Sequence, residues 1–282
     1  MLTLDNGQLA VELLDPSADR ARFGVRYCTG GYIFQVHDPR VGPLMSGPTY
    51  PTSFNWFDGQ GIPDAFNLGP LPSRTQAGHA VVIGIGLCDL NTRTVLDFCD
   101  WSITREGHAI RFVTAQALEG RAFTLCRTVS LAGRTVRSTT ELANTGRGEV
   151  SIRWFPHPFY PQPDSDELVW FNTPLHWVDG PGYRRLDNGF LARAAGAFSE
   201  TMADPRAEPK SVGHYLPLDH DAHAPLVLLQ RHPLLGLVGA ATSYIPSFFP
   251  IWGNAITFSW EPFFERSVAP GQTATWSVQY VF

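Results

Sequence analysis

A glutamate in the C-terminal part of the sequence is surrounded by residues that carry no charge. The segment Phe258–Phe264 reads FSWEPFF, and Glu261 is its one ionisable residue. Burial among apolar neighbours disfavours the charged form of a carboxylic acid and raises its pKa towards roughly 6–7, a range that suits a general base near neutral pH. The segment therefore predicts an acid–base role for Glu261. The alternative is a structural carboxylate that a nearby arginine, such as Arg266, neutralises.

A histidine in the middle of the sequence stands between two prolines. His157 lies in the segment Arg153–Pro161, which reads RWFPHPFYP, at the end of a predicted strand. Each proline fixes its own φ angle and restricts the residue before it, so the backbone around His157 is rigid. A rigid imidazole among aromatic side chains is well placed to transfer protons. The alternative is a histidine with a purely structural role at a strand end.

An aromatic segment lies just before Glu261. It covers Tyr244–Trp252 and reads YIPSFFPIW, so that Trp252 ends a predicted apolar strand. An indole ring in this place could stack on the apolar face of a sugar ring, although buried tryptophans are also common in protein cores.

A group of metal-ligand residue types occurs in the segment Asp219–His223, which reads DHDAH, with His214 and His232 nearby. The segment lies in a polar, proline-containing stretch, residues 199–223, without a regular element to bring the side chains onto one ion. We interpret it as a solvated loop and expect no metal site.

The elements that must position these residues are predicted to be strands throughout. Short runs of β-branched and aromatic residues are separated by glycine-containing turns, and no stretch shows the sustained periodicity of a helix. The predicted strands are Gln8–Leu14, Ala21–Tyr27, Tyr32–Val36, Ala80–Cys88, Val95–Thr104, Ala109–Ala115, Ala122–Leu131, Thr135–Leu142, Val150–Phe155, Leu168–Phe171, His176–Val178, Leu226–Gln230, Leu234–Ala241, Ala255–Trp260 and Thr273–Phe282. This pattern predicts one large all-β domain, an antiparallel β-sandwich over residues 1–282.

One stretch interrupts the strand pattern. Residues Gly42–Pro72 are rich in glycine, proline and aromatic residues and show little periodicity. Loops of this length in compact domains are usually functional. We therefore expect this segment to border the site.

Composition excludes several classes of partner. The net charge is −5 and the basic residues form no long run, which argues against a nucleic acid or an anionic membrane as partner. The N-terminal residues show no signal-peptide pattern, and we expect a cytoplasmic protein. The four cysteines, Cys28, Cys88, Cys99 and Cys126, match neither a zinc site nor a redox pair, so we expect buried free thiols.

Taken together, these segments resemble the aldose 1-epimerases of the galactose mutarotase superfamily. The C-terminal part, from Gly236 to Phe282, carries most of the likeness: an apolar strand ending in Trp252, the Glu261-Pro262 pair, a Pro-Gly turn and a final aromatic strand. Shorter matches lie upstream, at Gly30–Ile33, at Gly78–Gly86 followed by Trp101, and at His157–Tyr160.

The resemblance implies a supersandwich fold with an open cleft, Glu261 as catalytic base and His157 as catalytic acid. It also implies that Trp252 stacks on the sugar and that His79 takes the place of a substrate-binding histidine, although the residues around His79 do not reproduce the family pattern. For the acidic residue that holds sugar hydroxyls, Asp219 and Asp221 are candidates by their order in the chain.

The function that follows is mutarotation, the interconversion of the α and β anomers of a free aldose, without metal or other cofactor. The partner is then a small-molecule sugar, and the protein is a monomer or a homodimer. A non-catalytic sugar-binding or sugar-sensing protein on the same fold is the main alternative. A carbohydrate lyase is a second alternative, but the short chain lacks room for a helical toroid domain.

The charge of the sugar is left open by the sequence. Arginines bind phosphate or sulfonate through a planar fork of N–H donors, and Arg22, Arg40 and Arg74 lie in the N-terminal third, which should build the rim of the cleft. Trp56 and Phe57 are further candidates for stacking on the sugar.

Overall fold

Long strands with alternating burial form the larger layer of the protein. The computed structural model describes residues 1–46, 59–66, 69–176, 182–194 and 214–282. Strand β12, Arg121–Ala132, buries every second side chain, among them Phe123, Leu125 and Val129. Because successive side chains of a strand point to opposite faces, this alternation leaves one face of the sheet for the core and one for solvent.

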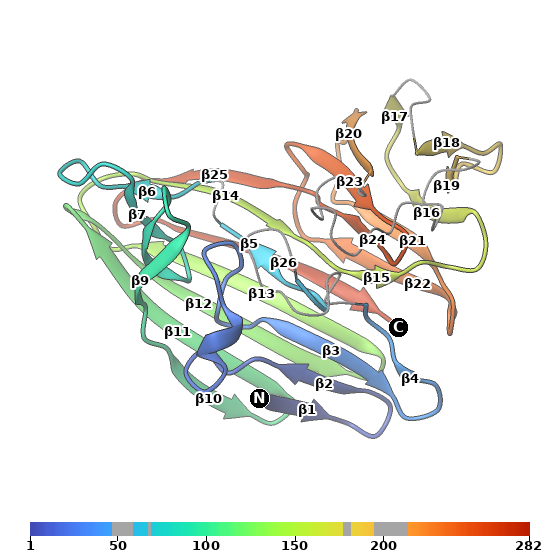
Figure 1. Cartoon of the computed structure of the whole chain (residues 1–282), viewed down its shortest axis with the longest axis horizontal. Coiled ribbons are helices and arrows are strands. Elements are labelled where there is room, and N and C mark those ends of the chain that lie inside the picture. The colour runs from blue at the N-terminus through green and yellow to red at the C-terminus, as the bar shows by residue number, and fades with distance from the viewer. Residues whose placement is uncertain (47–58, 67–68, 177–181, 195–213) are drawn as a thin grey trace.

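The described strands form five sheets, the largest of them ten-stranded (Figure 1). In spatial order its strands are β10 (Ser102–Glu106), β11 (Ala109–Leu118), β12, β13 (Thr135–Asn144), β26 (Thr273–Val281), β22 (Gly236–Thr242), β21 (Val227–His232), β16 (Glu167–Phe171), β19 (Leu191–Arg193) and β18 (Tyr183–Arg185). All neighbours pair antiparallel, and β26 joins the two halves by pairing with β13 on one side and β22 on the other.

The smaller sheets have between three and five strands among the described residues. One contains β1 (Leu2–Asp5), β2 (Ala10–Leu13), β3 (Ile33–Asp38) and β4 (Gly42–Pro43). Another contains β6 (Leu71–Pro72), β7 (His79–Val82), β8 (Gly86–Asp89) and β9 (Thr94–Phe98). The third is β25 (Phe264–Val268), β14 (Val150–Pro156) and β5 (Asp64–Ala65). The fourth is β15 (Tyr160–Pro161), β24 (Thr257–Trp260), β23 (Phe249–Gly253), β20 (His214–His220) and β17 (Leu175–His176).

The main hydrophobic core contains buried residues from all five sheets. It includes Val11 of β2, Leu125 of β12, Val81 of β7, Ile152 of β14 and Ile251 of β23. The buried face of the ten-stranded sheet is thus covered by the smaller sheets, which gives two packed β layers. This confirms the all-β sandwich predicted from the sequence. Among the described residues, no helix has the length and hydrophobicity needed to cross a membrane.

Several predicted strands differ from the structure. Ala21–Tyr27 is not a strand, because a short 3₁₀ helix, η1 (Arg20–Arg22), is followed by irregular chain. Ala80–Cys88 contains a turn and forms the hairpin β7–β8, and Val95–Thr104 is divided between β9 and β10. Conversely, His214–His220, predicted as part of a polar loop, forms strand β20 and pairs with β23. Pairing with an apolar neighbour strand imposed extended structure on a sequence whose own pattern is polar.

Candidate active site

The position of His157 is fixed by the segment just before β5, which runs alongside it. The backbone N–H of His157 donates to the carbonyl of Pro63 at 2.8 Å, and that of Phe159 donates to the carbonyl of Gly61 at 2.7 Å. Gly61 has a φ of +71°, and a Cβ there would collide with the backbone of Phe34. The glycine therefore lets this segment approach β3 closely and still pair with the segment that carries His157.

Strand β5 is itself anchored by a buried ion pair. Asp64 of β5 accepts hydrogen bonds from both terminal guanidinium nitrogens of Arg127 of β12, one of them measuring 2.7 Å, and both side chains are buried. Asp64 lies opposite Pro156, the residue before His157, in the β5–β14 pairing. The ion pair thus connects the ten-stranded sheet to the segment that holds the histidine.

Glu261 follows directly after β24. Its backbone N–H donates to the carbonyl of Pro250 in β23 at 2.9 Å. In the same β23–β24 pairing, Trp252 lies opposite Ser259. One hairpin therefore delivers the carboxylate, a hydroxyl and an indole to the same region.

The two predicted catalytic residues meet in this region. The Nε2 atom of His157 lies 3.3 Å from the Oε1 atom of Glu261, and the side chains are 4% and 8% exposed. The other ring nitrogen, Nδ1, forms a hydrogen bond of 2.9 Å with the hydroxyl of Ser259. Both imidazole nitrogens thus have a partner, which fixes the plane of the ring.

Aromatic rings enclose the imidazole. Phe159 stacks on it with the ring centroids 4.4 Å apart and the planes 13° from parallel. Tyr27 and Trp252 approach it edge-on at 6.1 and 6.0 Å. We call the surrounding group the aromatic cluster; its members are Leu14, Tyr27, Tyr32, Ala65, Phe155, Phe159 and Phe263, with Phe23, Phe34, Phe248 and Trp252 packed against them.

Burial changes the protonation of the pair. It raises the pKa of Glu261 to about 7, and the positive charge of Arg26 acts in the opposite direction. Burial also lowers the pKa of His157 well below its ordinary value, and Arg26 lowers it further. Near neutral pH the pair therefore holds at most one proton, which resides on the carboxyl group rather than on the imidazole. The sequence predicted the raised pKa of Glu261, but its assignment of a protonated His157 does not describe this resting state.

The expected alternative for Glu261 is not what the structure shows. Arg266 is exposed on β25, where it lies opposite Ile152. The side chain in contact with the carboxyl group of Glu261 is the imidazole of His157.

Two residues near Glu261 were not predicted. Tyr215 of β20 lies opposite Trp252 and is 54% exposed, and partial burial together with the charge of Glu261 raises the pKa of its phenol to about 12. Arg26 is half-buried, and its guanidinium lies over the ring of Tyr27 at 5.3 Å. Nothing in the sequence distinguished them: Tyr215 lies in the predicted loop, and Arg26 in a segment predicted as a strand.

The other predicted substrate-binding residues lie in different places. Trp252 contacts His157, as described. The guanidinium of Arg22 lies 4.9 Å from the ring centroid of Phe34, which packs against the aromatic cluster. His79 hydrogen-bonds to Gln76 at 2.9 Å in strand β7. Figure 1 shows β7 at one end of the molecule and β23 and β24 at the other. The structure therefore does not bring His79 to the His157–Glu261 pair.

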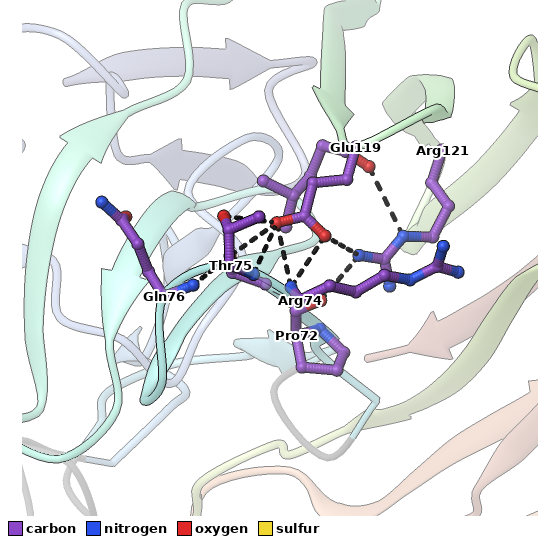
Figure 2. A network of polar contacts seen from close by, with 8 residues as sticks. Pro72, Arg74, Thr75, Gln76, Glu119 and Arg121 are labelled. Carbon is purple, nitrogen blue, oxygen red and sulfur yellow. Dashed lines mark hydrogen bonds and ion pairs between the residues drawn. The ribbon is translucent and has the colours of Figure 1, made fainter.

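Arg40 and Arg74 are also away from this pair. Arg40 forms an ion pair of 2.9 Å with Asp38 at the β3–β4 turn. Arg74 lies in the β6–β7 turn, where its backbone N–H donates to the carboxylate of Glu119 at 2.7 Å. Figure 2 shows this carboxylate among the donors of the turn, with Arg121 beside it. Arg74 thus lies in the same β6–β7 region as His79, and the guanidinium of Arg40 is paired with Asp38 at its own turn.

The acidic candidates lie on β20 and just after it. Asp219 is exposed and lies opposite His176, and Asp221 pairs with His176 at 2.9 Å with both side chains exposed. Among the described residues, no three histidine, cysteine, aspartate or glutamate side chains gather as a metal site would require. Trp56 and Phe57 lie outside the described residues.

Comparison with known proteins finds structures of similar fold but no related sequence. No family model matches the sequence, and no curated protein matches it. Solved structures do match over almost the whole chain, among them a galactose mutarotase related enzyme from Lactobacillus acidophilus, with a TM-score of 0.60, 11% identity, and 99% of this chain and 96% of that chain covered.

The fold is galactose mutarotase-like. A galactose mutarotase-like protein from Clostridium acetobutylicum matches with a TM-score of 0.55 at 11% identity and covers 99% and 93% of the two chains. An aldose epimerase homologue from C. elegans matches with a TM-score of 0.51 at 10% identity and covers 99% and 97%. The galactose mutarotase-like fold was the one implied by the sequence resemblance, and at these identities the likeness concerns the fold alone.

Proposed function

We propose that this chain is a mutarotase that interconverts the α and β anomers of a free aldose by acid–base ring opening. The observation that carries the proposal is the contact of 3.3 Å between His157 and Glu261, buried in the aromatic cluster of a galactose mutarotase-like fold. Solved structures of this fold include a galactose mutarotase related enzyme and an aldose epimerase homologue, which supports the same reaction class.

The chemistry requires one acid and one base. Ring opening removes a proton from the O1 hydroxyl and gives a proton to the ring oxygen. Rotation about the C1–C2 bond then exposes the other face of the aldehyde, and the reverse transfers close the ring as the other anomer. No electrons are gained or lost, so positioned acid–base groups alone can carry this reaction.

A pair that holds a single proton meets this requirement. With the proton on Glu261 the carboxyl group is the acid and the neutral imidazole is the base. With the proton on His157 the roles are exchanged. Because the two forms differ by one proton transfer within a contact of 3.3 Å, the same pair can serve ring opening and ring closure. The hydroxyl of Ser259 and the rings of Phe159 and Trp252 hold the imidazole in place during these transfers.

A purely structural role does not account for the burial of two titratable side chains in contact with each other. Burying an ionisable carboxyl group costs free energy, and a hydrophobic pair of similar volume would avoid this cost. Groups with strongly shifted pKa values, in contact with one another and next to exposed aromatic side chains such as Tyr215, are typical of catalytic sites.

The test is anomer exchange measured by saturation-transfer NMR on a panel of aldoses. We expect Glu261→Gln and His157→Asn each to lower kcat by about 10²–10⁴-fold, because each removes one proton-transfer group and nearly keeps the shape of the side chain. The matched controls are Glu106→Gln and His108→Asn, which make the same changes at exposed positions around the β10–β11 turn.

Two results would contradict the proposal. Wild-type rates in both site variants would show that the pair is not catalytic. Sugar binding by the wild-type protein without exchange of any sugar in the panel would instead identify a non-catalytic sugar-binding protein.

A further inference from the structure

The two ring nitrogens of His157 have partners of different chemistry. Nδ1 lies 2.9 Å from the hydroxyl oxygen of Ser259, and Nε2 lies 3.3 Å from Oε1 of Glu261. Ser259 belongs to β24, two residues before Glu261, and is fully buried. One side of the imidazole therefore faces a hydroxyl that lies away from solvent, and the other side faces the carboxyl group.

Packing keeps the imidazole in this orientation. Phe159 stacks on its face with the ring centroids 4.4 Å apart, and other rings of the aromatic cluster approach its edges. A turn of the ring about its bond to Cβ would break the contacts with Ser259 and Glu261 at the same time. Nε2 is therefore the nitrogen that is placed to exchange a proton with the carboxyl group or with a sugar.

The position of the imidazole hydrogen depends on both partners, because a neutral imidazole carries a single N–H. When the carboxyl group of Glu261 is protonated, its O–H faces Nε2, and Nε2 must accept. The N–H is then on Nδ1, where the hydroxyl oxygen of Ser259 accepts it. When the proton passes from Glu261 to His157, Nε2 gains a hydrogen and Nδ1 keeps its own. Ser259 thus accepts from Nδ1 in both forms of the pair.

Loss of this hydroxyl would favour the other tautomer of the imidazole. An N–H on Nδ1 would then be buried without its acceptor, which costs free energy. A hydrogen on Nε2 would avoid this cost, because the oxygen of Glu261 can accept it. In that tautomer, however, Nε2 has no lone pair with which to accept a proton from the carboxyl group or from a sugar.

We propose that Ser259 is a positioning residue: its hydroxyl holds His157 in the tautomer with the hydrogen on Nδ1 and so keeps the lone pair of Nε2 available for the proton that moves during ring opening. The role in catalysis rests on the proposed function, because the tautomer affects the rate only if His157 transfers protons. The tautomer itself is a property of the free protein and can be measured without a sugar.

The first measurement is the ¹⁵N NMR spectrum of the histidine side chains, in which ring nitrogens with and without hydrogen have different chemical shifts. The signals of His157 are identified by their absence in His157→Asn. Below about pH 7, where Glu261 holds its proton, we expect the wild-type protein to carry the hydrogen on Nδ1. In Ser259→Ala the hydrogen should move to Nε2. In Ser259→Thr, which keeps a hydroxyl, it should stay on Nδ1.

The second measurement is anomer exchange of the best sugar in the panel, with kcat and KM determined separately. We expect Ser259→Ala to lower kcat by about 10- to 100-fold, the range expected when one buried N–H loses its acceptor, and to leave KM nearly unchanged. Ser259→Thr should recover most of this loss.

The matched control is Thr257→Val, which removes another buried hydroxyl from the same strand. The hydroxyl of Thr257 donates to the carbonyl of Tyr160 at 2.7 Å. Its loss should lower the midpoint of urea denaturation but keep the tautomer of His157 and the kcat of the wild-type protein. The control thus separates a general loss of packing in β24 from the loss of the hydroxyl next to the imidazole.

The outcomes distinguish this proposal from the proposed function. A wild-type spectrum with the hydrogen on Nε2 would overturn the proposal without a variant being made, and exchange of sugars would still support the mutarotase. A loss of kcat in Ser259→Ala with the tautomer unchanged would also overturn it, as would an equal loss in Ser259→Thr, because the hydroxyl would then not set the tautomer. Exchange of no sugar at all would overturn the proposed function and with it the role of Ser259 in catalysis.

Discussion

The contact between two buried titratable side chains, His157 and Glu261, is the central chemical feature of this site. Burial raises the pKa of Glu261 and lowers that of His157. The carboxyl group therefore has the higher pKa of the two, the reverse of the order in water. The titration then belongs to the pair, and the singly protonated form exists between the two shifted values.

The pH dependence of exchange follows from this order. Below about pH 7 Glu261 is protonated and His157 is neutral, which is the form with one acid and one base. As the pH rises through about 7 the carboxyl group loses its proton and the acid is lost. We expect kcat/KM to fall above about pH 7 and to fall again only well below pH 6.5, where His157 becomes protonated. The measurement is a pH–rate profile for one good substrate, and a rate that keeps rising from pH 7 to 9 would contradict this assignment.

At this scale, local sequence was sufficient to single out the two residues that the structure brings into contact. The uncharged residues around Glu261 are its neighbours in the chain, and the prolines around His157 adjoin it, so both could be recognised without a structure. The contact of Glu261 with His157 and the position of Arg26 depend on how distant strands pack. No local pattern carries that information, and for this reason the sequence could not separate arginines that lie in turns, such as Arg40 and Arg74, from arginines near the pair.

At the scale of elements, the short strand β5 helps to fix the position of His157. It has two residues, yet it lies beside Pro156, and its neighbour Pro63 accepts the hydrogen bond from His157. The ion pair of Asp64 with Arg127 fixes it against the ten-stranded sheet. The sequence placed Asp64 in a long irregular segment, because a two-residue strand has no periodicity to detect.

Removing one partner of this buried ion pair should be costly. We expect Asp64→Asn to lower the free energy of unfolding by about 3–5 kcal/mol, because Arg127 is left as an uncompensated buried charge. Urea denaturation followed by tryptophan fluorescence measures this change. The double variant Asp64→Asn with Arg127→Met should recover part of the loss, since the unpaired charge is removed. If the single variant is as stable as the wild-type protein, the ion pair does not anchor β5.

Strand β20 shows the opposite limit of sequence reasoning. Its residues, HYLPLDH, contain a proline and charged side chains and resemble a loop. They form a strand because β23 offers an apolar partner, with which they pair in antiparallel register from His214 to Leu218. Strand pairing thus outweighed the low strand propensity of this sequence, and it placed Tyr215 opposite Trp252.

At the scale of the whole molecule, composition and turn spacing were sufficient to predict the architecture. Alternating burial along β11, β12 and β13 and the frequent glycine turns follow directly from the sequence. The order of strands in the sheets does not, since it depends on pairings between parts of the chain that are far apart, such as β13 with β26.

The cysteines provide a test of how rigid this architecture is. All four are free thiols; Cys28 and Cys88 are buried, and burial raises the pKa of each thiol to about 12. We therefore expect Cys28 and Cys88 to react with a thiol reagent at pH 8 only after denaturant is added, and a reducing agent to leave the unfolding curve unchanged. Thiol counting before and after denaturation measures this. Rapid labelling of both residues in the native protein would show that the β7–β8 region opens readily.

The position of β26 has a consequence for how the protein is made. Among the described strands it is the last to leave the ribosome, yet it lies between β13 and β22 in the ten-stranded sheet. Without β26, the sheet consists of two parts, one made of β10–β13 and the other of β22, β21, β16, β19 and β18, and each part has an open edge where β26 will pair. Pairing across such a sequence distance is slow, and open edges invite wrong partners. During synthesis the other nine strands of this sheet have therefore emerged while the sheet is still divided, and this is the stage at which wrong pairing of its edges is most probable.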